Sequence, residues 1–159
     1  MRGFHPVADG SCRRFRGPFA FAEGTDAETL RSGPGHYPGT DLPGQGGTVG
    51  IAGHRTTYQA PFRKNEQLRR GDEIVVSMPY GDFVYLVGRQ AVVSPTDAHV
   101  LDSGRRERLV LTACHPLYSD AQRLIVFAGL DRIEESSLDS RNRTSPTTAA
   151  SEMAMTASQ

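Results

Sequence analysis

Short runs of branched apolar residues, separated by polar and glycine-rich stretches, dominate the pattern along this chain. Three such runs lie at 74–78, 83–87 and 90–94. Each is short and bounded by turn-forming residues, which is typical of β-strands. The turn formers at 79–82 predict a hairpin between the first two runs, and Gly88 predicts a bulge before the third. Helix and strand do not alternate, so the pattern favours a closed or nearly closed β-barrel over a βαβ fold.

Two further apolar runs, 109–111 and 124–127, flank a short polar loop. The first leads into Cys114, and Pro116 prevents regular continuation of that strand. The second begins at Arg123. We therefore expect the thiol and the guanidinium to emerge at the same rim of the sheet, where a cation favours the reactive thiolate.

His54 is placed in the same way, because the apolar run 49–52 ends in a glycine and then delivers this side chain to a loop. A nucleophilic cysteine and its histidine commonly come from distant parts of a sequence. His115 directly follows Cys114 and is expected to point away from it. His99 falls in a predicted turn with no strand to deliver it, and His54 is a candidate for a proton carrier.

Helices are expected only as short connections. Residues 25–28 have a capping-box pattern, Pro61 favours a short helix to about Leu68, and Asp97 caps one turn to Leu101. Residues 33–47 contain six glycines and three prolines and therefore form a loop.

The length of 159 residues favours one domain with a real core. We expect an atypical or truncated N-terminal segment at 1–23, a β unit at 24–132 and a disordered Ser/Thr/Ala-rich tail at 133–159. Eighteen basic and eighteen acidic residues cancel, so nothing points to nucleic acid. No stretch reaches the ~20 apolar residues of a membrane span, and 1–23 lacks the apolar centre of a signal peptide.

Several motifs in one fixed order resemble a known family. They are Gly-Pro-Gly-His-Tyr-Pro at 33–38, Gly-His-Arg-Thr-Thr-Tyr at 53–58, Thr-Ala-Cys-His-Pro at 112–116 and Tyr-Ser-Asp-Ala-Gln-Arg at 118–123. Together they resemble the sortases, in particular the class E type of actinobacteria. The resemblance covers roughly residues 24–130 and implies a closed eight-stranded β-barrel, with a first strand near 19–21.

The resemblance also implies a cysteine transpeptidase. Cys114 would attack the Thr carbonyl of an LPXTG-like sorting motif, in which class E has Ala in place of Pro. His54 would act as general acid and then as base, and Arg123 would hold the peptide or the oxyanion. An amine from a cell-wall precursor or a protein would resolve the thioester.

Further expectations concern the surroundings of this site. Tyr37, Tyr58, Thr112 and Ala113 are the candidates for substrate contact, and Ala113 lacks the hydroxyl that the family commonly has beside its cysteine. The implied partners are surface proteins bearing a C-terminal sorting motif and a peptidoglycan precursor. The implied location is the extracytoplasmic face of the plasma membrane, although the anchor usual in the family is missing from this sequence.

Three alternatives stay open. A hydrolytic cysteine peptidase could use the same Cys/His/Arg set, and a non-catalytic barrel could bind peptides. A metal site could be written from His36, His54, Cys114 and His115, but their spacing matches no known ligand pattern, so we expect neither a metal nor a cofactor. The two cysteines, Cys12 and Cys114, are expected to be free thiols.

Overall fold

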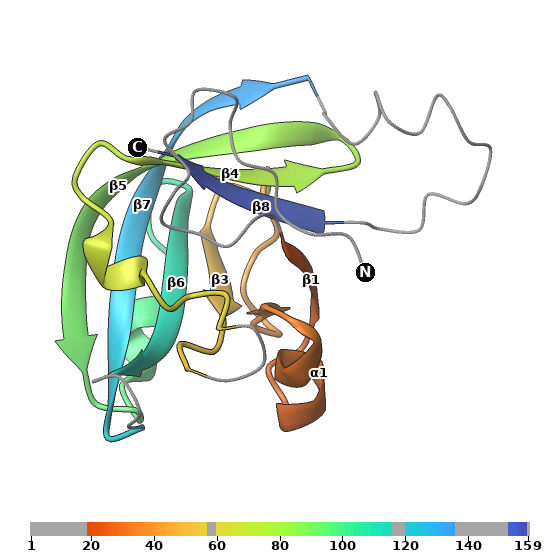
Figure 1. Cartoon of the computed structure of the whole chain (residues 1–159). Coiled ribbons are helices and arrows are strands. Elements are labelled where there is room, and N and C mark those ends of the chain that lie inside the picture. The colour runs from red at the N-terminus through yellow and green to blue at the C-terminus, as the bar shows by residue number, and fades with distance from the viewer. Residues whose placement is uncertain (1–18, 57–59, 116–119, 136–152, 159) are drawn as a thin grey trace.

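The computed structural model describes residues 19–56, 60–115, 120–135 and 153–158, most of which lie in β-strands (Figure 1). The strands are β1 (Phe19–Glu23), β2 (Gly35–His36), β3 (Thr48–Ala52), β4 (Glu73–Met78), β5 (Gly81–Val93), β6 (Arg108–His115), β7 (Gln122–Glu134) and β8 (Met153–Ser158). The helices are α1 (Ala27–Ser32) and the 3-10 helices η1 (Asn65–Gln67) and η2 (Ala98–Leu101). The prediction of an all-β protein with short helices is confirmed. No helix in the described ranges is both long and apolar enough to cross a membrane.

The strands follow the spatial order β1-β2-β3-β6-β7-β5-β4-β8. The pairs β1/β2 and β3/β6 are parallel, and the other pairs are antiparallel. Strands β1 to β7 alone form one curled sheet with edges at β1 and β4. Strand β8 pairs with both edges, so this single strand joins the two ends of the curled sheet.

Strand β8 corrects the prediction of a disordered tail over 133–159, because Met153–Ser158 pair with two other strands. The physical reason is that β1 and β4 each present an edge of backbone N–H and C=O groups that need partners. The expected first strand is confirmed as β1, so the β unit begins before residue 24. The remaining stretches, 1–18 and 136–152, lie outside the described residues.

The predicted hairpin is confirmed, with Met78 opposite Gly81 at its turn. The runs at 83–87 and 90–94 belong to one long strand, β5, whose register shifts between Val87 and Arg89. This shift is the bulge expected at Gly88.

The helix predictions are confirmed in part. Helix α1 is capped by Asp26 rather than by Thr25, since the Asp26 carboxylate accepts from the Thr29 N–H at 2.9 Å. The helix expected to begin at Pro61 is reduced to η1. Asp97 caps η2, as predicted.

Alternation along β6 and β7 separates two packing layers. Leu109, Leu111 and Val126 belong to the main core inside the curled sheet. Val110 and Ile125 belong to a smaller cluster on the outer face, against which Val100 and Leu101 of η2 pack. Since side chains alternate along a strand, the even-numbered positions of β6, including Thr112 and Cys114, share the outer face.

Candidate active site

Cys114 and Arg123 are directly opposite each other on the antiparallel strands β6 and β7. Side chains of opposite residues in such a pair leave the sheet on the same face. The Cys114 thiol is free and half-buried. The structure therefore confirms that the thiol and the guanidinium emerge at the same rim.

One end of the Arg123 guanidinium is hydrogen-bonded to backbone carbonyl oxygens near the start of β7. Its Nη1 donates to the backbone carbonyl oxygens of Asp120 at 2.9 Å and Gln122 at 3.1 Å. These bonds fix the orientation of the planar group beside Cys114. A fixed guanidinium is suited to hydrogen bonding an oxygen that gains negative charge.

His54 follows the end of β3, which lies next to β6. Ala52 is opposite Thr112, and the Gly53 N–H donates to the Thr112 carbonyl oxygen at 3.1 Å. The His54 carbonyl oxygen then accepts from the Phe62 N–H at 3.0 Å. Burial lowers the pKa of His54, so the neutral imidazole is favoured.

Gly53 is required by packing beside this histidine. A Cβ at position 53 would lie 2.7 Å from Cδ2 of the buried Phe62 ring. That ring therefore fills the space that a side chain would need. Gly53 thus lets the Phe62 ring pack directly against the backbone beside His54.

The loop that carries His54 is bonded to the strand that carries the thiol. Arg55 donates from Nη1 to the Cys114 carbonyl oxygen at 2.9 Å, and its Nη2 lies 2.7 Å from a Glu66 carboxylate oxygen. Its side chain is almost completely buried. Sequence reasoning missed Arg55, although its place directly after His54 in the Gly-His-Arg motif was a usable signal.

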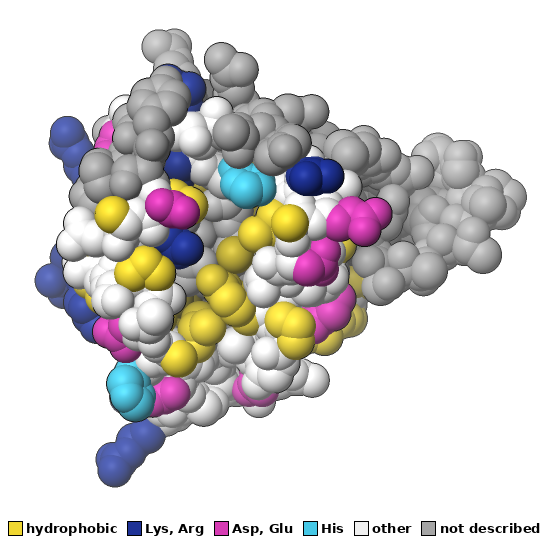
Figure 2. All heavy atoms as spheres, turned by 90° about the horizontal axis from the view of Figure 1, so that it is seen from below, with side chains coloured by type: hydrophobic (Ala, Val, Ile, Leu, Met, Phe, Trp, Pro, Cys, Tyr) yellow, Lys and Arg dark blue, Asp and Glu magenta, His cyan; other side chains and the backbone are white. Residues whose placement is uncertain are grey.

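A groove lies beside the rim on the outer face, with a cavity volume of about 150 Å³. Tyr37, Thr112, Arg123 and Ile125 line it together with residues from the segment 93–101. The Tyr37 phenol and the Thr112 hydroxyl are hydrogen-bonded at 2.7 Å. Figure 2 shows the end of the molecule where β3 and β6 finish, and apolar side chains form a band across it.

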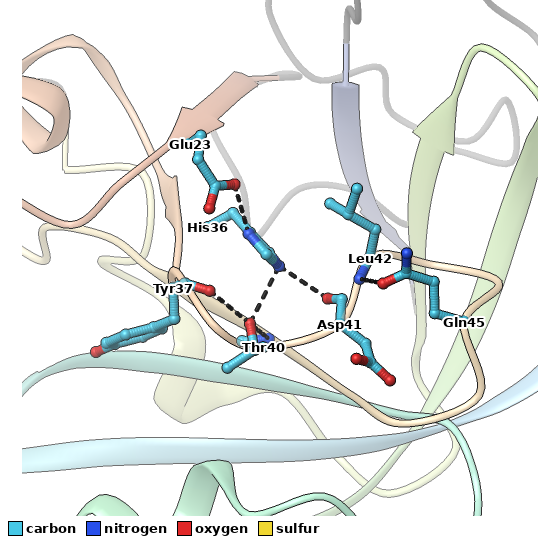
Figure 3. A network of polar contacts seen from close by, with 8 residues as sticks. Glu23, His36, Tyr37, Thr40, Asp41, Leu42 and Gln45 are labelled. Atoms are coloured by element: carbon cyan, nitrogen blue, oxygen red, sulfur yellow. Dashed lines mark hydrogen bonds and ion pairs between the residues drawn. The ribbon is translucent and has the colours of Figure 1, made fainter.

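The loop that carries Tyr37 is fixed by His36, which is 2 % exposed. His36 Nδ1 lies 2.6 Å from a Glu23 carboxylate oxygen, and Nε2 lies 2.8 Å from the Asp41 carbonyl oxygen (Figure 3). Thr40 Oγ1 also contacts Nε2, at 3.1 Å. His36, the last residue of β2, is therefore a packed residue that orders one wall of the groove.

The other predicted contact residues differ in outcome. The structure brings Tyr37 and Thr112 together at the groove. It contradicts the prediction for Ala113, whose side chain is 3 % exposed and packs in the main core, because alternation along β6 places it on the face opposite Cys114. Tyr58 lies outside the described residues. Within the described ranges, no three His, Cys, Asp or Glu side chains gather to hold a metal ion.

Comparisons with known proteins agree with this geometry. A family model described as "Sortase domain" matches residues 14–131. Sortase D of Bacillus subtilis is 35% identical over 95 residues, which are 59% of this chain and 46% of that protein. Sortase SrtE1 of Streptomyces coelicolor is 34% identical over 122 residues, covering 67% of this chain and 35% of that protein.

A solved structure of Sortase E1 from Streptomyces coelicolor, with a tripeptide in the active site, is 29% identical to this chain. It superimposes with a TM-score of 0.66 over 80% of this chain and 85% of the other. The chain spans about half or less of the curated relatives it matches.

Proposed function

Because the chain belongs to the sortase family of cysteine transpeptidases, we propose that it cleaves an LPXTG- or LAXTG-type sorting motif between Thr and Gly and joins the new acyl group to an amine. The observation that carries this proposal is the direct pairing of Cys114 with Arg123 beside the loop of His54. A purely binding protein needs no thiol at that position.

In the first step, the Cys114 thiolate attacks the Thr carbonyl carbon and forms a C–S bond, while the carbonyl oxygen becomes an oxyanion. Arg123 donates hydrogen bonds to that oxygen. When the intermediate collapses, the Thr–Gly C–N bond breaks and protonated His54 gives its proton to the leaving amine. The product is a thioester between Cys114 and the Thr carbonyl.

In the second step, an amine attacks the thioester and neutral His54 accepts its proton. The C–S bond breaks, the Cys114 thiolate leaves, and a new amide is formed. Burial lowers the pKa of His54 and so favours the neutral imidazole that this step uses. The enzyme returns with its thiolate and a protonated histidine, so the protons balance over the cycle.

The groove beside Arg123 is the proposed site for the residues that precede the scissile bond. Its apolar floor at Ile125 suits the Leu of the motif, and Tyr37 and Thr112 form its polar wall. The proposed partners are surface proteins with a C-terminal sorting motif and a peptidoglycan-precursor or protein amine. The proposed location is the extracytoplasmic face of the plasma membrane, where both partners are present.

Mass spectrometry of the protein incubated with a Leu-Ala-X-Thr-Gly peptide tests this proposal. We expect an acyl adduct on Cys114, release of the Gly fragment, and a new amide product when glycine or triglycine is added. C114A and H54A should abolish the amide product. H99A is the matched control, because the His99 side chain is 92 % exposed and its removal should leave turnover unchanged.

The open alternatives give different results in the same experiment. A hydrolytic peptidase would form the adduct and release only acid, whatever amine is supplied. A non-catalytic barrel would form no adduct although it is folded. Either result would overturn the transpeptidase proposal for this motif.

A further inference from the structure

Arg55 is among the largest fully buried side chains of the described chain, at 1 % exposure. A buried guanidinium is costly unless its charge and its donors are satisfied. Here Nη2 is paired with the Glu66 carboxylate at 2.7 Å, and Nη1 donates to the Cys114 carbonyl oxygen at 2.9 Å. The second acceptor belongs to the residue that bears the nucleophilic thiol.

The geometry of the β3/β6 pair explains why this acceptor needs a side-chain donor. The Thr112 carbonyl oxygen accepts from the Gly53 N–H, so it faces β3. Backbone groups two residues apart on a strand face the same side, and the Cys114 carbonyl oxygen therefore also faces β3. Strand β3 ends at Ala52, and Arg55 Nη1 supplies the bond that a continued β3 would otherwise donate.

We propose that Arg55 is a positioning residue that fixes Cys114 relative to His54. Arg55 directly follows His54, so one side chain joins the backbone of the proton carrier to the backbone of the nucleophile. Glu66 anchors the same guanidinium to η1 and sets its direction. This inference rests on the proposed function for its catalytic meaning.

Arginine suits this role better than lysine, because a planar fork holds two acceptors in fixed directions at once. R55K keeps the charge but cannot present both bonds in the same geometry. E66Q keeps a carbonyl oxygen for Nη2, whereas E66A removes the acceptor. We therefore expect activity to decrease in the order wild type, E66Q, R55K and R55M.

Steady-state kinetics with the sorting-motif peptide and triglycine give the first test. A misplacement of about 1 Å between reacting groups costs on the order of 100-fold in rate. We therefore expect R55M to lower kcat about 100-fold with KM within about twofold. R132M is the matched control, because Arg132 is paired with Glu73, Asp131 and Glu134 near the other end of β7 and should leave kcat unchanged.

Alkylation of Cys114 by iodoacetamide gives a second readout that needs no peptide turnover, with peptide mapping to separate it from Cys12. We expect H54A, R55K and R55M each to slow alkylation. In the double variant H54A/R55K the second substitution should slow alkylation little further. Arg55 acts by holding Cys114 in place relative to His54, and this has no effect once the imidazole is gone. A merely structural role would give independent, additive effects.

The outcomes separate the two proposals. If wild type forms no adduct with the peptide, the proposed function fails. The alkylation rates of the single variants and of H54A/R55K then decide the role of Arg55. If R55M does not fold by thermal melting, R55K decides. A folded R55K with the wild-type kcat and alkylation rate, or additive effects in the double variant, would overturn the positioning role.

Discussion

At the scale of single residues, His54 and His99 are expected to titrate in opposite directions. Burial lowers the pKa of His54, whereas the hydrogen bond and the charge of Asp102 raise the pKa of His99. As pH falls from 8, His99 should therefore take up its proton first and His54 last. Following the imidazole C–H signals by NMR, with H54A and H99A for assignment, should place the His54 midpoint below 6.5 and the His99 midpoint above it.

The same shifts have opposite consequences for stability. A His54 pKa below its unfolded value contributes stability above pH 6.5 that is lost as pH falls through the folded pKa. A raised His99 pKa contributes stability below pH 6.5 that is lost as pH rises. A His54 midpoint at or above that of His99 would contradict the burial seen around His54.

Residue by residue, the sequence predicted what the chain can do chemically better than where each side chain points. Cys114, His54 and Arg123 were recognisable because each begins or ends an apolar run. Ala113 was placed at the substrate although the same alternation that exposes Cys114 turns its neighbour into the core. Arg55 was missed because its partner is a backbone carbonyl, which no sequence pattern reveals.

At the scale of elements, Glu107 fastens the far end of the 33–47 loop. Its carboxylate oxygens accept from the N–H groups of Gly44 and Gly46, each at 3.0 Å, and from the Tyr85 hydroxyl at 2.7 Å. E107Q replaces one acceptor oxygen by a donor that faces another donor. We expect this change to lower the free energy of unfolding by about 1–3 kcal/mol, measured by urea denaturation.

A matched control for this prediction is E135Q, a change at an exposed position. Gly44 and Gly46 have φ of +96° and +90°, values that favour glycine, so the loop is built to present these two amides. Equal unfolding free energies for E107Q and E135Q would show that the carboxylate does not hold the loop.

Elements with a strong local signal were predicted well, and elements held by distant partners were not. The β4/β5 hairpin combines two apolar runs with a turn, and both features are local. Strand β2 is only two residues long and lies in a Gly- and Pro-rich stretch for which the sequence predicts a loop. It forms because β1 and β3 flank it, which is a tertiary effect.

At the scale of the whole molecule, the active-site rim and the closing strand are far apart in the ring. The site uses β3, β6 and β7, whereas β8 lies between β1 and β4. The family resemblance predicted a closed eight-stranded barrel; seven strands form the curled sheet, and β8, which pairs with both of its edges, lies in the stretch predicted to be a disordered tail. Its backbone pairing with two edges, rather than any apolar run, places it there.

Removal of residues 153–159 should therefore lower stability without changing the chemistry. Both β1 and β4 would lose a hydrogen-bonded neighbour, at a net cost of about 1 kcal/mol for each bond lost, and would become open edges prone to association. We expect a lower midpoint of thermal unfolding and faster amide exchange in β1 and β4. At low temperature, kcat/KM per folded molecule should stay within about twofold of the full chain, because Cys114 keeps all its described neighbours.

Removal of Gln159 alone is the matched control, since β8 ends at Ser158. T156P provides a variant of full length, because Thr156 is opposite Val75 and proline removes the N–H at that position. If closure by β8 stabilises the ring, T156P and the seven-residue truncation should both speed exchange in β4, and the control should not. Unchanged exchange in β4 with the truncated chain would show that the curled seven-stranded sheet is stable without its closing strand.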